Sequence, residues 1–323
     1  MVNPEKTLRA GVWSVVKHDY LPRAVAAHPR FELLVVAADG DQPNWVHERN
    51  QRFADEFGIP YVPDVPKAIA EHDLDLVAVS SEAERDCNLA VRAADAGLHV
   101  IADKPMSTRL SECDRLVEAV QRNNIKFLLW NRNYLPALIQ AKEAVQSGAI
   151  GELYAIHVDF YFSKDAGPPK GARQPGDPPI NWLERQIEAH ADGSDGGIGI
   201  EAMGELQIEG IYPLGYIRML TGADVRRVFA RTATHFHQAN VDNHVDDLAT
   251  VSLELKTASS ARFASGASAR RAIRTSAKSR FTPSARKEGL SSPRLGRKLA
   301  SITVTSRRWS SKTNVLPMRM TSY

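Results

Sequence analysis

The residues best placed to do chemistry are Asp103, Lys104 and Pro105, which directly follow the apolar run 98–102. Such a run predicts a buried β-strand, and open α/β sheets bind ligands at the carboxyl ends of their strands. A lysine there can hold a cofactor ribose or a substrate hydroxyl. Proline, which lacks a backbone N–H, ends the strand and orients the side chain before it. The end of an ordinary strand with a solvated Asp–Lys pair has the same local pattern. The predicted elements around these residues must therefore show whether they form a functional site.

A second candidate feature is the first predicted strand–helix turn, where a dinucleotide-binding domain carries G-x-G-x-x-G. Counted from Gly11, the second and third glycine positions hold Trp13 and Val16. Ser14 and the backbone amides remain as phosphate contacts, so we include Gly11, Trp13 and Ser14 among the candidate cofactor-binding residues.

Asp39 ends the second predicted strand. A carboxylate there accepts a hydrogen bond from a ribose 2′-OH and repels a 2′-phosphate, which favours NAD, while NADP stays open. The alternative is a turn residue before Gly40.

The first half of the chain alternates strand and helix patterns. We expect strands at 8–16, 31–38, 75–80, 98–102 and 126–130, and helices at 19–27, 44–57, 85–96, 108–123 and 135–147. Strands separated by helices of this length predict βαβ units and a parallel sheet with right-handed crossovers. The fold class is therefore α/β, with a doubly wound dinucleotide-binding domain over residues 1–130.

The second half has a different pattern. It predicts a long strand at 152–162, a helix at 200–220 interrupted near Gly204 and Gly210, and alternating strands at 225–234 and 247–255. A helix beside an antiparallel sheet is typical of an α+β domain, here over residues 131–255, which would complete a site with the first domain.

Composition narrows the class of protein. With 43% hydrophobic and 24% charged residues, no apolar signal core and no long apolar span, the chain is expected to be a soluble cytoplasmic protein without a membrane partner. Cys87 and Cys113, the two cysteines, suit a reducing compartment and predict buried helical thiols.

The formal net charge of +3 conceals an abrupt change near residue 256. Residues 1–255 carry 25 Lys and Arg against 37 Asp and Glu, whereas residues 256–323 carry 16 against one and hold 14 serines. The hypothesis we adopt is a shifted reading frame, which predicts a non-native or disordered tail and an incomplete second sheet. The alternative is a nucleic-acid-binding tail, and the negative charge of the preceding residues argues against it.

Together these features resemble the Gfo/Idh/MocA family, the glucose–fructose oxidoreductase and inositol dehydrogenase group, over residues 8–255. Residues 102–105 stand in place of the family's E-K-P signature, and 147–152 match its S-G-x-[IL]-G-E junction. Residues 210–214 match G-x-Y-P-L, and 245–251 are similar to the strand that leads into its sheet.

The resemblance implies an NAD(P)-dependent oxidoreductase that transfers a hydride between a nicotinamide cofactor and a sugar or cyclitol CH–OH group. Lys104 would contact the reacting hydroxyl or the nicotinamide ribose, flanked by Asp103 and Pro105. Tyr212 would take the hydroxyl proton, and a neighbouring ammonium such as Lys104 would favour its phenolate. Ser80 and Ser81, where the family has Thr-Pro, would line the nicotinamide pocket. A homo-oligomer is expected from the family, although the altered tail argues against it.

The chain departs from the family pattern in its second domain. The acid expected four residues before Tyr212 is replaced by Ile208, with Glu209 beside it, so Glu209 is an alternative base. His235, His237, His244, Asp246 and Asp247 are spaced as strand residues around a loop, and we predict no metal. The alternative function is a catalytically impaired or non-catalytic relative, which the altered glycine loop favours.

Overall fold

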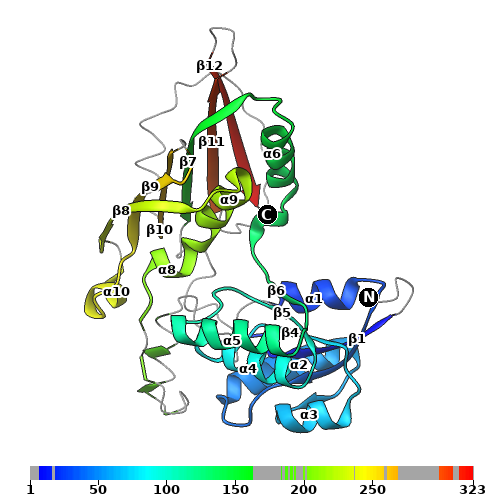
Figure 1. Cartoon of the computed structure of the whole chain (residues 1–323). Helices are drawn as coiled ribbons and strands as arrows, with labels where there is room; N and C mark the ends of the chain where they lie inside the picture. Colours follow the sequence, from blue (N-terminus) through cyan, green and yellow to red (C-terminus); the bar gives the residue numbers. More distant parts are fainter. Residues whose placement is uncertain are drawn as a thin grey trace, which may run out of the picture. The chain divides into compact units, whose positions relative to one another are not determined.

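The chain divides into two compact units in the computed structural model, Met1–Asn131 with Gln174–Glu201 and Arg132–Arg173 with Ala202–Tyr323 (Figure 1). The structure describes residues 7–16, 19–162, 183, 186–187, 190–191, 193, 199–200, 202–235, 237–257, 260–267, 298–307 and 313–322, the last two ranges by their backbone. The two units are described separately below.

The first unit contains a six-stranded parallel sheet in the order β3-β2-β1-β4-β5-β6. Its strands are β1 (Leu8–Trp13), β2 (Phe31–Ala37), β3 (Tyr61–Val62), β4 (Leu76–Val79), β5 (His99–Ala102) and β6 (Phe127–Leu129). The order reverses between β1 and β4, which makes this edge the switch point where doubly wound folds bind ligands. The α/β fold class predicted from the sequence is confirmed.

Helices cover both faces of this sheet. The helices are α1 (Tyr20–Ala27), α2 (Asn44–Phe57), α3 (Val65–Glu71), α4 (Ala83–Asp95) and α5 (Leu110–Arg122). Buried side chains of α1 and α2 pack with Val12 and Val36 on one face, and those of α3, α4 and α5 pack with Trp13 and Val35 on the other. Successive strand residues therefore alternate between two cores, which explains why the strands are apolar without interruption.

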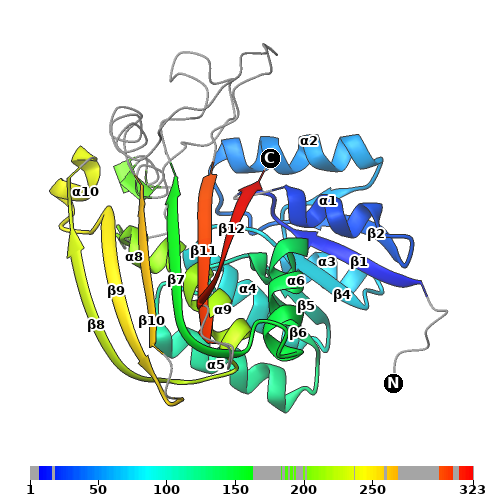
Figure 2. The same ribbon diagram turned by 90° about the horizontal axis from the view of Figure 1, so that it is seen from above.

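The second unit contains a mixed sheet in the order β12-β11-β7-β10-β9-β8 (Figure 2). Its strands are β7 (Glu152–Phe162), β8 (Val225–Ala233), β9 (Leu248–Leu255), β10 (Ser260–Ala267), β11 (Lys298–Arg307) and β12 (Thr313–Ser322). All neighbours are antiparallel except β7 and β10. This agrees with the predicted, mainly antiparallel α+β domain.

Helices α6 (Pro136–Gln146) and α9 (Ile211–Thr221) share one hydrophobic core with this sheet, including Leu138, Tyr216, Phe160 and Val251. The helix expected at 200–220 is two helices, α8 (Glu205–Glu209) and α9. The break falls at Gly210, where an added Cβ would lie 2.2 Å from the Leu206 carbonyl oxygen. Helices η1 (Arg132–Tyr134) and α10 (Gln238–Asp242) are short connections that the sequence analysis did not expect.

Three strands of the second sheet, β10, β11 and β12, come from residues 256–323, for which the sequence analysis expects a non-native or disordered tail. β10 pairs with β9 on one side and β7 on the other. Every second side chain of β10 is buried, at Ala261, Phe263 and Ser265, and Phe263 is 1% exposed. This alternation places one face of β10 in the core of the sheet, although the sequence around the strand is basic. Residues 268–297 of the expected tail lie outside the described residues.

Within the described part of the chain, none of the helices has both the length and the apolar character required to cross a lipid bilayer.

Candidate dinucleotide site

The turn between β1 and α1 begins three residues later than the sequence analysis placed it. Gly11 lies inside β1, where an added Cβ would meet the side chains of Leu74 at 3.0 Å and Val77 at 3.3 Å, so the backbone of β1 packs closely against these two side chains. Ser14 is the first residue after β1 and has a φ of 67°, a left-handed conformation that favours glycine. Counted from Ser14, the three glycine positions hold Ser14, Val16 and Asp19.

The loop amides already have acceptors within the unit. The Ser14 N–H donates to the Ala37 carbonyl at 2.9 Å, and the Val16 N–H donates to the Ser80 carbonyl at 3.0 Å. The Val15 N–H donates to Oδ1 of buried Asn50 at 2.9 Å. The loop therefore lies against the sheet and α2, and these three N–H groups are not free to donate to a phosphate. Trp13 is fully buried at the end of β1.

A pocket beside this loop carries an excess of arginine. It is lined by Val15 and Asp19 next to the loop, Arg23 on α1, and Arg49, Arg52, Phe53 and Glu56 on α2. Arg23 is hydrogen-bonded to Asp19 and Glu56. Three guanidinium groups against two carboxylates leave a positive balance next to the loop, which fits the charge of a pyrophosphate.

Asp103 and Lys104 follow β5 at the carboxyl edge of the sheet, and both are buried, at 0% and 2% exposed. The Lys104 backbone N–H donates to Asp103 Oδ1 at 2.8 Å, and Ser80 Oγ lies 3.4 Å from Asp103 Oδ2. The Tyr20 hydroxyl lies 3.5 Å from Asp103 Oδ1. Asp103 thus connects the ends of β4 and β5 to the start of α1 and holds the backbone of Lys104 in place.

Ser81 and Pro105 are also buried at this edge. The Ser81 N–H donates to Asp86 Oδ1 and its hydroxyl donates to Glu82 Oε2, both at 2.7 Å. These bonds fix Ser81 at the start of α4. The structure therefore brings Ser14, Ser80, Ser81, Asp103, Lys104 and Pro105 to one edge.

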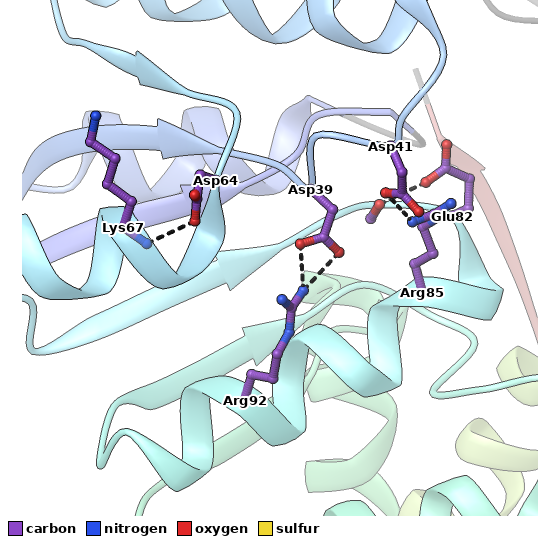
Figure 3. Close-up of polar contacts among 8 residues, drawn as sticks. Asp39, Asp41, Asp64, Lys67, Glu82, Arg85 and Arg92 are labelled. Carbon is purple, nitrogen blue, oxygen red and sulfur yellow. Dashed lines mark hydrogen bonds and ion pairs between the residues drawn. The ribbon is translucent and has the colours of Figure 1, made fainter. Parts of the chain in front are cut away.

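Asp39 lies two residues beyond β2 and faces α4 (Figure 3). Nη2 of Arg92 donates to both carboxylate oxygens of Asp39, at 2.8 and 2.7 Å. Two turns closer to the start of α4, Arg85 Nη1 donates to Asp41 Oδ1 at 2.9 Å. Burial lowers the pKa of Arg85, but the Asp41 hydrogen bond and the charges of Glu82, Asp41 and Asp39 outweigh it and raise the pKa above its ordinary value.

The residues at this edge fit a nicotinamide dinucleotide. The Asp39 carboxylate suits the hydroxyls of the adenosine ribose, and Lys104 suits the nicotinamide end. Arg92 Nε and Arg85 Nη2 are buried N–H groups without an acceptor in the described part of the chain, and both belong to arginines that pair with the carboxylates after β2.

The candidate base residues lie in the second unit. Tyr212, on α9, is 1% exposed, and its ring centroid lies 5.2 Å from that of Phe160. The guanidinium carbon of Arg132 lies 5.1 Å from the Tyr212 ring centroid, so this unit supplies its own cation to the tyrosine. Glu209, at the end of α8, is 7% exposed.

The aspartates after α10 have structural contacts. Asp246 Oδ2 accepts the Leu206 N–H at 2.9 Å at the start of α8, and Gly204 passes so close that an added Cβ would lie 2.0 Å from Asp246 Oδ1. Asp247 accepts the backbone N–H groups of His235 and His237. In the part of the chain that the structure describes, no group of three or more His, Cys, Asp or Glu side chains is arranged to hold a metal.

Sequence reasoning missed Asn50, Arg85 and Arg92. A signal existed for the arginines, because a spacing of seven residues puts both on one face of the predicted helix that follows Ser80. No signal existed for Asn50, whose role depends on the packing of α2 against the loop.

Comparison with known families matches residues 18–129 to the family model GFO_IDH_MocA, described as an oxidoreductase family with an NAD-binding Rossmann fold. The chain is 26% identical over 161 residues to inositol 2-dehydrogenase of Salmonella typhimurium, covering 48% of the chain and 46% of that protein. It is 29% identical over 230 residues to dTDP-3,4-didehydro-2,6-dideoxy-alpha-D-glucose 3-reductase of Actinomadura kijaniata, covering 71% of the chain and 59% of the reductase. The chain thus spans about half the length of the curated relatives it matches.

Solved structures share the fold. Myo-inositol 2-dehydrogenase from Lactobacillus plantarum superposes with a TM-score of 0.69 at 15% identity, covering 96% of the chain and 76% of that structure. Scyllo-inositol dehydrogenase from Lactobacillus casei, solved with NAD(H) and scyllo-inositol, gives 0.68 at 15% identity and the same coverages.

Proposed function

We propose that this chain, which matches the Gfo/Idh/MocA family model over residues 18–129, is an oxidoreductase of that family and transfers a hydride between NAD and a CH–OH group of a sugar or cyclitol. The observation that carries the proposal is the carboxyl edge of the first sheet. There Asp39 follows β2, and buried Lys104 follows β5 beyond the switch point between β1 and β4. A bound nicotinamide supplies the acceptor or donor of the hydride.

In this proposal the residues of the chain divide the work. Asp39 binds the adenosine ribose, and Ser80 and Ser81 border the nicotinamide. Lys104 binds the reacting hydroxyl, and its burial keeps water from the ammonium group, which strengthens that contact. Asp103 positions Lys104 through its backbone N–H. The pyrophosphate is held beside Asp19 and the arginine-lined pocket. The loop amides do not hold it, because they already donate to carbonyl groups of the unit.

Removal of the hydroxyl proton is assigned to Tyr212, with Glu209 as the alternative base. The Arg132 guanidinium lies over the Tyr212 ring and helps to hold the ring in place. This assignment needs the two units to serve one site, as the family resemblance implies.

The first experiment is a screen for NAD and NADP reduction over sugars and inositols. We expect reduction of NAD by at least one polyol, and a Lys104→Met variant, which keeps the length and apolar stem, to lower kcat about 10²- to 10⁴-fold. Lys126→Ala, at an exposed lysine before β6, is the matched control and should leave the rate unchanged. Equal rates for Lys104→Met and the parent chain would remove Lys104 from the reaction.

Tyr212→Phe distinguishes the two candidate bases, because it preserves ring packing and removes only the hydroxyl. If Tyr212 is the base, kcat of the variant falls about 10²- to 10⁴-fold, and the increase in kcat with rising pH is lost. Glu209→Gln then has a smaller effect. Tyr216→Phe, one turn further on the same helix, is the control.

A second candidate function is a non-catalytic relative that has lost cofactor binding. The specific observation in its favour is the occupation of all three glycine positions by Ser14, Val16 and Asp19, with the amides of residues 14–16 bonded within the unit. Titration with NADH, followed by the intrinsic tryptophan fluorescence of the chain, separates the two functions. No response at millimolar NADH would favour the non-catalytic relative.

A further inference from the structure

Two arginines of α4 each hold a carboxylate that follows β2. Arg92 holds Asp39 through Nη2, and Arg85 holds Asp41 through Nη1 (Figure 3). Asp39 and Arg92 are partly buried, with side-chain exposures of 24% and 31%, and Arg85 is 12% exposed. The two guanidinium groups are therefore fixed at the place assigned above to the adenosine ribose.

Neither guanidinium has all its donors satisfied. Arg92 Nε and Arg85 Nη2 are buried, and no acceptor for either lies in the described part of the chain. A guanidinium presents its N–H groups as a planar fork that matches the oxygens of a phosphate. A phosphate monoester arriving here would meet donors that the protein itself leaves unused.

The charges around the two arginines oppose that arrival. Glu82, which accepts the Ser81 hydroxyl, adds a third carboxylate to Asp39 and Asp41. Three carboxylates against two guanidinium groups leave one negative charge, so a dianionic phosphate is repelled. Removing the Asp39 carboxylate brings the net charge of this cluster to zero and frees the N–H groups of Arg92 that Asp39 accepts.

We propose, on the basis of the dinucleotide site assigned above, that Arg92 is a specificity-determining residue for the 2′-position of the adenosine ribose. Asp39 accepts the 2′-OH of NAD(H) and at the same time covers Arg92. Arg92 in turn fixes the direction of the Asp39 carboxylate. When Asp39 loses its charge, Arg92 becomes the contact for the 2′-phosphate of NADP(H). The charge of Asp39 therefore determines whether this ion pair favours NAD(H) or NADP(H).

The test is a double-mutant cycle measured by calorimetric binding of NADH and NADPH to the full chain, the Asp39→Ser and Arg92→Ala variants, and the double variant. We expect the parent chain to bind NADH more tightly than NADPH. Asp39→Ser should tighten NADPH binding about 10- to 100-fold, the range of one charge-assisted hydrogen-bonded contact, and weaken NADH binding. The double variant should lose the gain in NADPH binding.

Fragments isolate the adenosine end: adenosine 2′,5′-bisphosphate should gain affinity in Asp39→Ser relative to AMP, again only with Arg92 present. Arg122→Ala, which breaks the exposed Arg122–Asp95 pair of the same unit, is the control and should change neither cofactor's affinity. Circular dichroism confirms that each variant is folded.

The outcomes separate this inference from the function it rests on. If the parent chain binds neither NADH nor NADPH, the proposed function and this inference both fail. If the parent binds NADH but Asp39→Ser gains no NADPH affinity, or keeps its gain without Arg92, the role of Arg92 alone is wrong.

Discussion

Burial determines the reactivity of the two cysteines at the scale of single residues. Cys87, on α4, is 1% exposed, and desolvation, with smaller contributions from nearby Cys113 and Glu112, raises the pKa of its thiol to about 12. Cys113 is less buried, and desolvation also raises the pKa of its thiol. The sequence predicts buried helical thiols, which holds for Cys87, whereas Cys113 is partly exposed. A raised pKa makes both thiols less reactive, because the thiolate is the reactive form.

We expect Cys113 to react with iodoacetamide faster than Cys87 in the folded protein, and both to react slowly at pH 9 compared with the chain in denaturant. Because the folded pKa of Cys87 exceeds the ordinary value of 9.0, its contribution to stability is present below pH 9 and is lost as the pH rises towards 12. Mass spectrometry of the labelled peptides measures both rates. Faster labelling of Cys87 would contradict its burial.

Tyr216 carries a buried hydroxyl without a hydrogen-bond partner in the described part of the chain, and burial raises the pKa of this phenol. Tyr216→Phe removes the unpaired hydroxyl and keeps the ring contact with Phe160. We expect it to increase the free energy of unfolding by about 1 kcal/mol, measured by denaturant titration. A loss of stability of that size would show that the hydroxyl is paired in solution.

At the scale of elements, the loop between β1 and α1 depends on α2. Asn50 is fully buried on α2 and accepts the Val15 N–H, while its Nδ2 lies 3.3 Å from Ser14 Oγ. This pair of contacts holds Ser14 in the left-handed conformation that its side chain disfavours.

Asn50→Ala should lower the free energy of unfolding of the first unit by about 2 kcal/mol, because it leaves a buried N–H without an acceptor. Gln51→Ala, at the exposed neighbour, should change it by less than about 0.5 kcal/mol. Thermal denaturation of both variants measures the difference. Equal stabilities would mean that the loop finds another acceptor.

Helices and strands of the first unit were largely predictable from sequence. The helix expected at 44–57 matches α2 in both bounds, since Gly58 ends it in the left-handed conformation. β3 and α3 were missed, because a two-residue strand and a seven-residue helix carry too short a pattern.

At the scale of the whole molecule, the expected tail raises the question of how the second sheet is completed. Phe263 of β10 is buried in the same core as Phe160 and Tyr212, whereas Phe229 of edge strand β8 is 73% exposed. The two phenylalanines therefore provide a matched pair for testing whether residues after 256 fold into the sheet.

Phe263→Ala should lower the free energy of unfolding of the second unit by about 3–5 kcal/mol, and Phe229→Ala should have an effect below about 0.5 kcal/mol. Denaturant titration followed by circular dichroism measures both. Equal, small effects would support the shifted-frame hypothesis, in which the tail does not join the sheet.

Sequence by itself determined the α/β class, the order of the main elements and the resemblance to one family, because apolar periodicity and short motifs such as residues 102–105 are local properties of the chain. It also identified Asp39 and Lys104 as candidate site residues. Only the tertiary structure decided that the turn begins at Ser14, that the amides of residues 14–16 are bonded within the unit, and that Arg92 pairs with Asp39. Those features depend on contacts between residues 23 or more positions apart, such as Ser14 with Ala37, Val15 with Asn50 and Asp39 with Arg92, which packing creates and no local pattern encodes.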